Sequence, residues 1–163
     1  VKREITKGAT DGETASNLID DTIRARKEYK GSGNPTLFTS EDVLAEMLLL
    51  KDKNGIRIYK SVDELATAMR VSKIVTVPQF DGNLTRENTA SNKKDTFTLK
   101  AIMVNLVDYT VGADKGGAVS MFDDFDIDYN QMKYLIETRC SGALTVPKSA
   151  IVFETKETST IGG

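Results

Sequence analysis

The sequence predicts an α+β protein whose helices and strands pack around one β-sheet, and two observations carry this prediction. Up to Pro78, helical periodicity alternates with short β-branched runs such as Lys73 to Pro78. From Thr96 to Phe153 the chain instead holds successive β-rich runs separated by glycines. Helices concentrated in one half and strands in the other are typical of α+β packing.

Apolar periodicity and capping residues place three helices. For the first, Ser16 is the expected N-cap, with aspartates early and basic residues late, the order that the helix dipole favours. For the third, Ser61 and Glu64 form a capping box, in which each side chain can accept from the other's backbone amide. The predicted helices span Asn17 to Lys30, Glu41 to Lys51, and Ser61 to about Arg70.

The remaining apolar runs predict strands and turns. Asn54 and Gly55 predict a tight turn. Between Asp81 and Asp95, Leu84 is the one apolar side chain of any size, so this segment is expected to be a mobile surface loop. The predicted strands span Arg3 to Lys7, Thr36 to Ser40, Lys73 to Pro78, Thr96 to Val111, Ala118 to Phe122, Phe125 to Tyr129, Met132 to Cys140, and Ala143 to Phe153.

The apolar residues change phase near Asn130 and Gln131. They occupy odd positions from Phe125 to Tyr129 and even positions from Met132 to Cys140. Because a slip of one residue moves every side chain to the other face of a strand, a turn or bulge must separate the two runs. Cys140 is then expected on the inner face as a small buried hydrophobe.

Composition narrows the possible classes of function. With 163 residues, 39% hydrophobic and 28% charged, the chain fits one globular domain. Its net charge of -2 gives no global attraction to nucleic acid or to an anionic membrane. It has no histidine, the commonest general base, so Cys140 is not expected to be a catalytic thiol.

The single cysteine and the lack of targeting patterns predict the compartment. One cysteine excludes an internal disulfide, and no apolar run reaches the roughly 18 residues of a membrane span. The N-terminus has no apolar segment after its basic residues, so it is not a secretion signal. An intracellular, reducing compartment is expected. Because the chain begins with Val1 and ends in Gly-Gly, we also expect it to be a piece of a longer protein.

Four aspartates lie within six positions of the segment "MFDDFDIDYNQ" and are the strongest candidate for chemistry. Asp124, Asp126 and Asp128 have the D-x-D-x-D spacing of a calcium loop. However, Tyr129 stands where that loop requires glycine, and Leu135 where it requires a bidentate glutamate. Their alternation with apolar residues predicts a half-buried strand whose acids face solvent or a neighbouring subunit. We therefore expect no metal site and no cofactor.

Two other features have a chemical and a purely structural interpretation. The segment Gly112 to Gly117 lacks the Gly-Lys-Ser/Thr ending of a phosphate loop and precedes a strand, so a hairpin turn is expected. The basic residues Arg24, Arg26, Lys27 and Lys30 could touch phosphates, but on one helix they spread over more than one face. A solvated basic surface is the expected outcome. No enzyme is predicted.

Two long stretches combine these features in a recurring order. "ARKEYKGSGNPTLFTSEDVLAEMLLLKDKNG", followed by "LATAMRVSKIVTVP", gives a helix, a short strand, a second helix, a Leu-Lys-Asp-x-x-Gly turn and a strand closing on proline. "DYTVGADKGGAVSMFDDFDIDYNQMKYLIETRCSGALTVPKSAIVF" gives a Gly-Gly hairpin, an acidic segment, a long strand with E-x-R and a closing strand that contains proline. In order and spacing, over nearly the whole chain, these stretches resemble the major capsid proteins of tailed bacteriophages and prophages.

The resemblance implies the HK-ninety-seven-like capsid fold, with an axial domain of mixed β-sheet flanked by helices and with strands of a peripheral domain. Residues 9–131 would form the axial domain, and residues 1–8 and 132–163 would contribute strands to the peripheral domain. The family's N-terminal arm, extended hairpin loop and long spine helix are not found in this sequence.

The resemblance also implies a structural virion protein. Its copies would assemble in the bacterial cytoplasm, as hexamers and pentamers of an icosahedral head, around phage DNA held without sequence specificity. Scaffold and portal proteins would be further partners, and no membrane is involved. Such a protein needs charge-complementary edges that select the register between copies. The candidate subunit-contact residues are Asp124, Asp126, Asp128, Glu137 and Arg139.

Three other functions stay open. A bacterial nanocompartment shell protein would share the fold and enclose enzymes. A calcium-binding or metal-dependent hydrolase would use Asp124, Asp126 and Asp128. A monomeric interaction module would carry the same surface without self-assembly.

Overall fold

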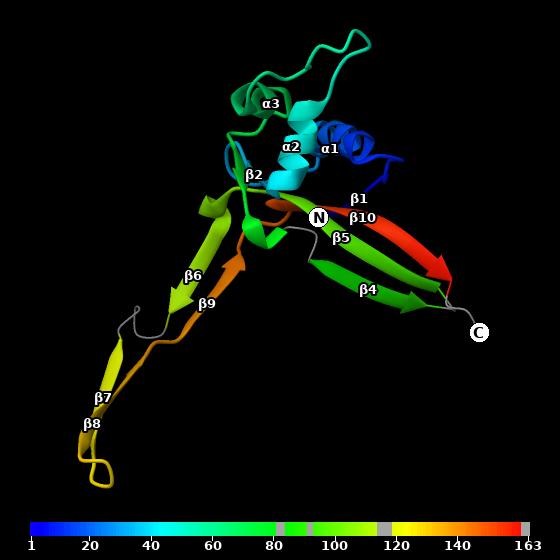
Figure 1. The fold of residues 1–163 in the computed structure, drawn as a ribbon. Coiled ribbons are helices and arrows are strands. Elements are labelled where there is room, and N and C mark those ends of the chain that lie inside the picture. Colours follow the sequence, from blue (N-terminus) through cyan, green and yellow to red (C-terminus); the bar gives the residue numbers. More distant parts are fainter. Residues whose placement is uncertain (81–83, 91–92, 114–118, 161–163) are drawn as a thin grey trace. The chain divides into compact units, whose positions relative to one another are not determined.

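A computed structural model describes residues 1–80, 84–90, 93–113 and 119–160 of the chain. The chain divides into two compact units, one of residues 1–106 with 146–163 and one of residues 107–145 (Figure 1). Helices and a mixed sheet confirm the predicted α+β class. The prediction of one sheet is incomplete, because the described residues also form two separate two-stranded ladders.

The larger unit is built on a six-stranded sheet. Its strands are β1 (Lys2–Ile5), β2 (Thr36–Thr39), β3 (Ile74–Thr76), β4 (Thr85–Ala90), β5 (Lys93–Val104) and β10 (Ala150–Thr160). The order is β1-β10-β5-β2-β3, and β4 pairs with the beginning of β5. The β1–β10 and β2–β3 pairs are parallel and the others are antiparallel, so the sheet is mixed. The strands that the resemblance assigns to two capsid domains, β10 and β5, share the longest ladder of this sheet, and the domain assignment stays a prediction.

A β-bulge interrupts the long ladder between β5 and β10. Phe153 pairs with Ala101 while Glu154 pairs with Leu99, so Lys100 is the extra residue on β5. The buried Thr39 hydroxyl donates to the Lys100 carbonyl at 2.9 Å, which satisfies the acceptor that the bulge displaces.

Three helices lie on one face of this sheet: α1 (Asp11–Ala25), α2 (Glu41–Leu49) and α3 (Val62–Ala68) (Figure 1). Two short 3-10 helices, η1 (Pro78–Phe80) and η2 (Leu106–Asp108), follow β3 and β5. The core between helices and sheet contains the fully buried side chains Ile5, Leu18, Leu37, Met47, Leu65, Met69, Met103, Ile151 and Phe153. No helix in the described part of the chain is long and apolar enough to cross a membrane.

The first helix differs from its prediction at both ends, while the other two begin where predicted. Thr10, not Ser16, is the N-cap, and its hydroxyl accepts from the Glu13 amide at 3.2 Å. Glu13 in turn accepts from the Ala9 amide at 2.7 Å, so the pair anchors an earlier start. The helix ends at Ala25 rather than Lys30, because the following amides turn back to carbonyls three residues earlier. Ser40 and Ser61 cap α2 and α3.

The segment predicted as a mobile loop, Asp81 to Asp95, forms strand β4 and the beginning of β5. The pairing runs from Thr85 with Thr98 to Ala90 with Lys93. These polar strands are stable here because their backbone groups pair with each other and because Arg86 of β4 reaches Glu154 of β10 across β5. Residues 81–83 and 91–92 of the predicted loop lie outside the described residues.

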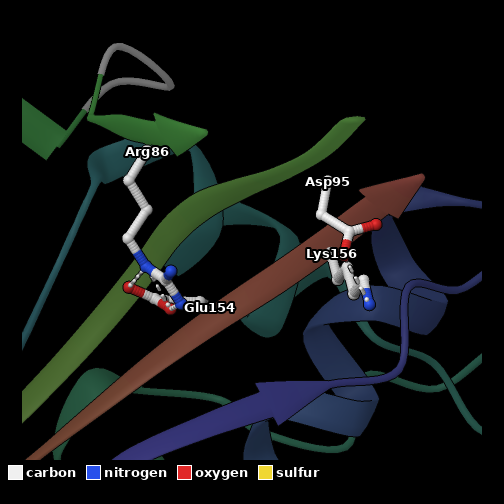
Figure 2. Close-up of polar contacts among 4 residues, drawn as sticks. All are labelled: Arg86, Asp95, Glu154 and Lys156. Carbon is white, nitrogen blue, oxygen red and sulfur yellow. Dashed lines mark hydrogen bonds and ion pairs between the residues drawn. The ribbon is translucent and has the colours of Figure 1, made fainter. Parts of the chain in front are cut away.

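On the sheet face away from the helices, β4 is joined to β10 across β5. The Arg86 guanidinium donates to both carboxylate oxygens of Glu154 at 2.7–3.1 Å (Figure 2). The guanidinium carbon lies 3.8 Å from the centre of the Phe97 ring, and the hydrogen bonds that Arg86 donates to Glu154 raise the pKa of Arg86 above the ordinary value. The Lys156 Nζ lies 3.0 Å from the Asp95 Oδ2 on the same face. These pairs fix the register of three strands.

The smaller unit contains the other two ladders. Strand β6 (Tyr109–Ala113) pairs with β9 (Cys140–Leu144), and β7 (Ser120–Asp126) pairs with β8 (Gln131–Glu137), both antiparallel. The two strands predicted from Ala118 to Phe122 and from Phe125 to Tyr129 are replaced by the one strand β7, which ends at Asp126. The strand predicted from Met132 to Cys140 ends at Glu137, and the one predicted from Ala143 to Phe153 is divided between β9 and β10. The predicted hairpin turn after Gly112 falls on residues 114–118, outside the described residues.

Candidate interaction surface

Strands β7 and β8 form a two-stranded hairpin, which we call the ribbon (Ser120–Asp126 with Gln131–Glu137). The turn of the ribbon begins at Asp126, whose Oδ1 accepts a hydrogen bond from the Asp128 amide at 3.1 Å. Asn130 ends the turn with φ 49°, the left-handed conformation that asparagine tolerates better than most residues. This turn separates the two apolar runs at the predicted position, so the predicted change of phase is confirmed.

One face of the ribbon is apolar and exposed. Directly opposed residues of an antiparallel pair point to the same face. The pairs Met121–Ile136 and Phe125–Met132 therefore lie on the same face as Tyr134, with Asp123 as its one charge. The five apolar side chains are 46% to 66% exposed. No second layer covers this face among the described residues of the ribbon's own unit.

The opposite face is mainly polar. It carries Ser120, Phe122, Asp124, Asp126, Gln131, Lys133, Leu135 and Glu137. Asp126 forms an ion pair with Lys133, diagonally across the two strands, and this pair supports the register of the hairpin. The ribbon is thus amphipathic in the manner of a strand pair that has one face packed and one face solvated.

The structure brings together three of the five predicted contact residues. Asp124, Asp126 and Glu137 share the polar face, where Asp124 and Glu137 are exposed. Asp128 lies in the turn, and Arg139 lies after the end of β8; both are exposed. The four acidic residues of this set are distributed along the length of the hairpin and do not surround a common point. Within the described ranges, no group of three or more acidic or cysteine side chains is placed to hold a metal ion.

The exposed apolar face is what the sequence interpretation missed. The alternation of Met132, Tyr134 and Ile136 indicated an inner face, and a buried Cys140 was expected to continue it. The structure leaves all four exposed, so the expectation of burial is wrong. The reason is physical: alternation shows that one face of a strand is apolar, but it does not show what covers that face.

An uncovered apolar face makes the ribbon a candidate interaction surface. An isolated two-stranded hairpin is at best marginally stable in water, and a contiguous exposed apolar patch usually marks a contact with another molecule. Fully burying one large apolar side chain stabilises by about 1.5–3 kcal/mol. Since these five side chains are about half exposed, covering the face adds roughly 1 kcal/mol for each of them. The apolar face is therefore the candidate interaction surface of the described chain.

A scan of the chain against models of known protein families found no match, and a comparison with curated proteins likewise found none. The fold and the ribbon together define the class of protein as a mixed α+β protein that carries an extended, amphipathic interaction hairpin.

Proposed function

We propose that this chain is a portion of a tailed-bacteriophage or prophage major capsid protein of HK-ninety-seven-like fold. It acts by repeated contacts with copies of itself and catalyses no reaction. The observation that carries the proposal is the apolar ribbon face, which is exposed and needs a partner. The order and spacing of the sequence features that resemble capsid proteins support the choice of a second copy as that partner.

The strength of the contact fits a shell better than a pair. Five half-exposed side chains contribute roughly 5 kcal/mol in total, whereas association opposes binding by about 4–15 kcal/mol. One ribbon contact is therefore marginal at best for holding two copies together. Contacts that repeat around a closed ring reinforce one another, because each copy is held at more than one surface. Hexamers and pentamers of a head shell provide such closure.

The polar face then selects the register between copies. Asp124, Asp128 and Glu137 are exposed carboxylates and Arg139 is an exposed cation, so they are available for charge pairing between subunits. Asp126 already pairs with Lys133 in its own hairpin, so its main effect is to support the ribbon that presents the others. Scaffold and portal proteins, and DNA enclosed without sequence specificity, are further partners under this proposal, and the virion is its location.

The test compares two neighbouring residues on opposite ribbon faces. Ile136 lies on the apolar face and Leu135 on the polar face, and their exposures are similar at 66% and 57%. Each is replaced by serine in the complete gene product, expressed with its scaffold. Sedimentation velocity and electron microscopy measure particle yield. We expect Ile136→Ser to abolish particles and Leu135→Ser to retain most of them.

The fold of each variant is checked by circular dichroism. A normal yield from Ile136→Ser, or an equal loss from both variants with the fold intact, would contradict the role of the apolar face.

A further inference from the structure

A basic groove lies in the larger unit, between the end of α1, the turn after it and the end of α3. Its volume is about 580 Å³. Four of the eight residues that line it are cations, and none is an acid. The cations are Arg24, Arg26, Lys27 and Arg70.

The gathering of these cations depends on where α1 ends. The sequence places Arg24, Arg26 and Lys27 on one helix, where their charges spread over several faces. In the structure the helix stops at Ala25, and the Lys27 amide turns back to the Arg24 carbonyl at 3.4 Å. The three side chains therefore line one groove instead of spreading over several helix faces. Arg24, Lys27 and Lys30 are exposed, as expected of a solvated basic surface, and Lys30 does not line the groove.

Arg70 reaches the groove through an unfavourable backbone conformation. It follows α3 with φ 59°, the left-handed position that ends many helices and that glycine usually occupies. The Arg70 amide donates to the Thr67 carbonyl at 3.1 Å, and the Val71 amide donates to the Ala66 carbonyl at 3.0 Å. A side chain at such a position is disfavoured, and residues held in this way gather at functional sites. Here the residue adds a charge to the groove.

The charge of the groove is not neutralised by nearby acids. Asp21 and Glu28, the acids on either side of the cluster, pair instead with Arg3 at 3.6 and 2.7 Å. In the described part of the chain, no carboxylate lies within 4.0 Å of Arg24 or Arg70. The same holds for Lys27.

Arg26 is held in place by its neighbours and, in the described part of the chain, keeps one unused hydrogen-bond donor, its Nε. Its Nη2 donates to Asn34 Oδ1 at 2.8 Å, and its guanidinium lies 5.1 Å from the centre of the Tyr29 ring. Its Nε is buried and has no acceptor among the described residues. Gly31 and Gly33 also line the groove, and the absence of side chains there leaves room for a ligand beside the backbone.

We propose that this groove binds a phosphate group, either as free phosphate or within a nucleic-acid backbone. Phosphate presents several acceptor oxygens and fits the planar fork of a guanidinium, of which the groove supplies three. Four uncompensated cations favour one or more phosphate groups over a single carboxylate. Phosphate binding at this groove does not require self-assembly, so a failure of this proposal would not contradict the proposed shell function, and the reverse is also true.

The test uses the unassembled chain and two probes: inorganic phosphate by calorimetry, and a fluorescent DNA duplex of random sequence by anisotropy. The central variant is Arg70→Gly, which removes the charge and relieves the left-handed strain. We expect it to raise the melting temperature and to weaken binding about tenfold. For the duplex, the slope of log affinity against log salt should also fall by about 1.

A double variant, Arg24→Gln with Lys27→Gln, tests the other side of the groove and should weaken binding further. Arg57→Gln is the matched control, because Arg57 is exposed and does not line the groove. Loss of binding to both probes by the groove variants alone supports a site that takes nucleic-acid phosphates. Loss with inorganic phosphate alone supports a free-phosphate site.

Three outcomes would overturn the proposal. The first is that neither probe binds. The second is that Arg57→Gln weakens binding as much as Arg70→Gly does. The third is that an acidic peptide with the sequence of Ser120 to Glu137 binds the groove while both phosphate probes do not.

Discussion

Phe153 in the larger unit and Phe125 in the ribbon lie at equivalent places in their local patterns. Both lie in strands: Phe125 stands between Asp124 and Asp126, and Phe153 is followed by Glu154. Phe153 is fully buried beneath the helices, whereas Phe125 is 49% exposed. The two regions thus use similar sequence patterns for different purposes: one builds a core within the chain, and the other presents an apolar face outward. The difference lies in what packs on the face, not in the strand itself.

The largest expected effect tests this difference directly. Phe153→Ala should lower the free energy of unfolding by about 3–5 kcal/mol, because it leaves a cavity in a packed core. Phe125→Ala should lower it by less than about 1 kcal/mol in the unassembled chain, because much of its ring already contacts water. Urea unfolding followed by circular dichroism measures both. Similar losses from the two variants would show that the ribbon face is packed within the chain.

A smaller effect separates two ion pairs of the larger unit. Glu154→Gln removes a bidentate partner of Arg86 at a site where the carboxylate is nearly buried. Glu87→Gln removes the partner of Lys94 at an exposed site of the same sheet. We expect the first to lower the urea midpoint clearly, though less than Phe153→Ala does, and the second to change it little. If both variants unfold at the wild-type midpoint, the pair in Figure 2 does not hold β4 on the sheet.

The smallest expected effect is a pH dependence in the larger unit. A hydrogen bond from Lys7, together with its charge, lowers the pKa of Glu157 below the ordinary value. Because the pKa is lower in the folded state, the pair stabilises the fold above the ordinary carboxyl range near pH 4.3. That contribution is lost as the pH falls through the folded-state pKa.

Melting temperatures of the wild type and of Glu157→Gln, measured between pH 7 and pH 3, test this pH dependence. The wild type should melt slightly higher at pH 7, and the difference should shrink as the pH falls toward 3. A difference that stays constant across this range would mean that Glu157 acts through something other than its charge.

Local signals in the sequence predicted much of the larger unit. The capping serines at Ser40 and Ser61 and the turn at Asn54 and Gly55 appear where expected, because each depends on residues within a few positions. The first helix shows the limit of such signals. Thr10 and Glu13 form a capping box like the one at Ser61, but few apolar residues follow it directly, so apolar periodicity alone places the start of this helix too late.

The candidate sites were less predictable than the fold. The turn at Asn130 and the two faces of the ribbon follow from periodicity, but the exposure of Tyr134 and Ile136 does not. The basic groove needed two facts that no local pattern contains. One is the early end of α1, and the other is the meeting of Arg70 with residues more than forty positions earlier in the chain.

By itself, the sequence determined the α+β class, the caps of α2 and α3, the phase of the ribbon strands and the lack of histidine as a general base. These features depend on neighbouring residues or on composition. Tertiary structure alone decided that β4 joins the sheet through Arg86 and Glu154, that the ribbon leaves its apolar face exposed, and that four cations share one groove. Burial and charge neutralisation depend on residues far apart in the chain, and only folding brings those residues together or leaves them uncovered.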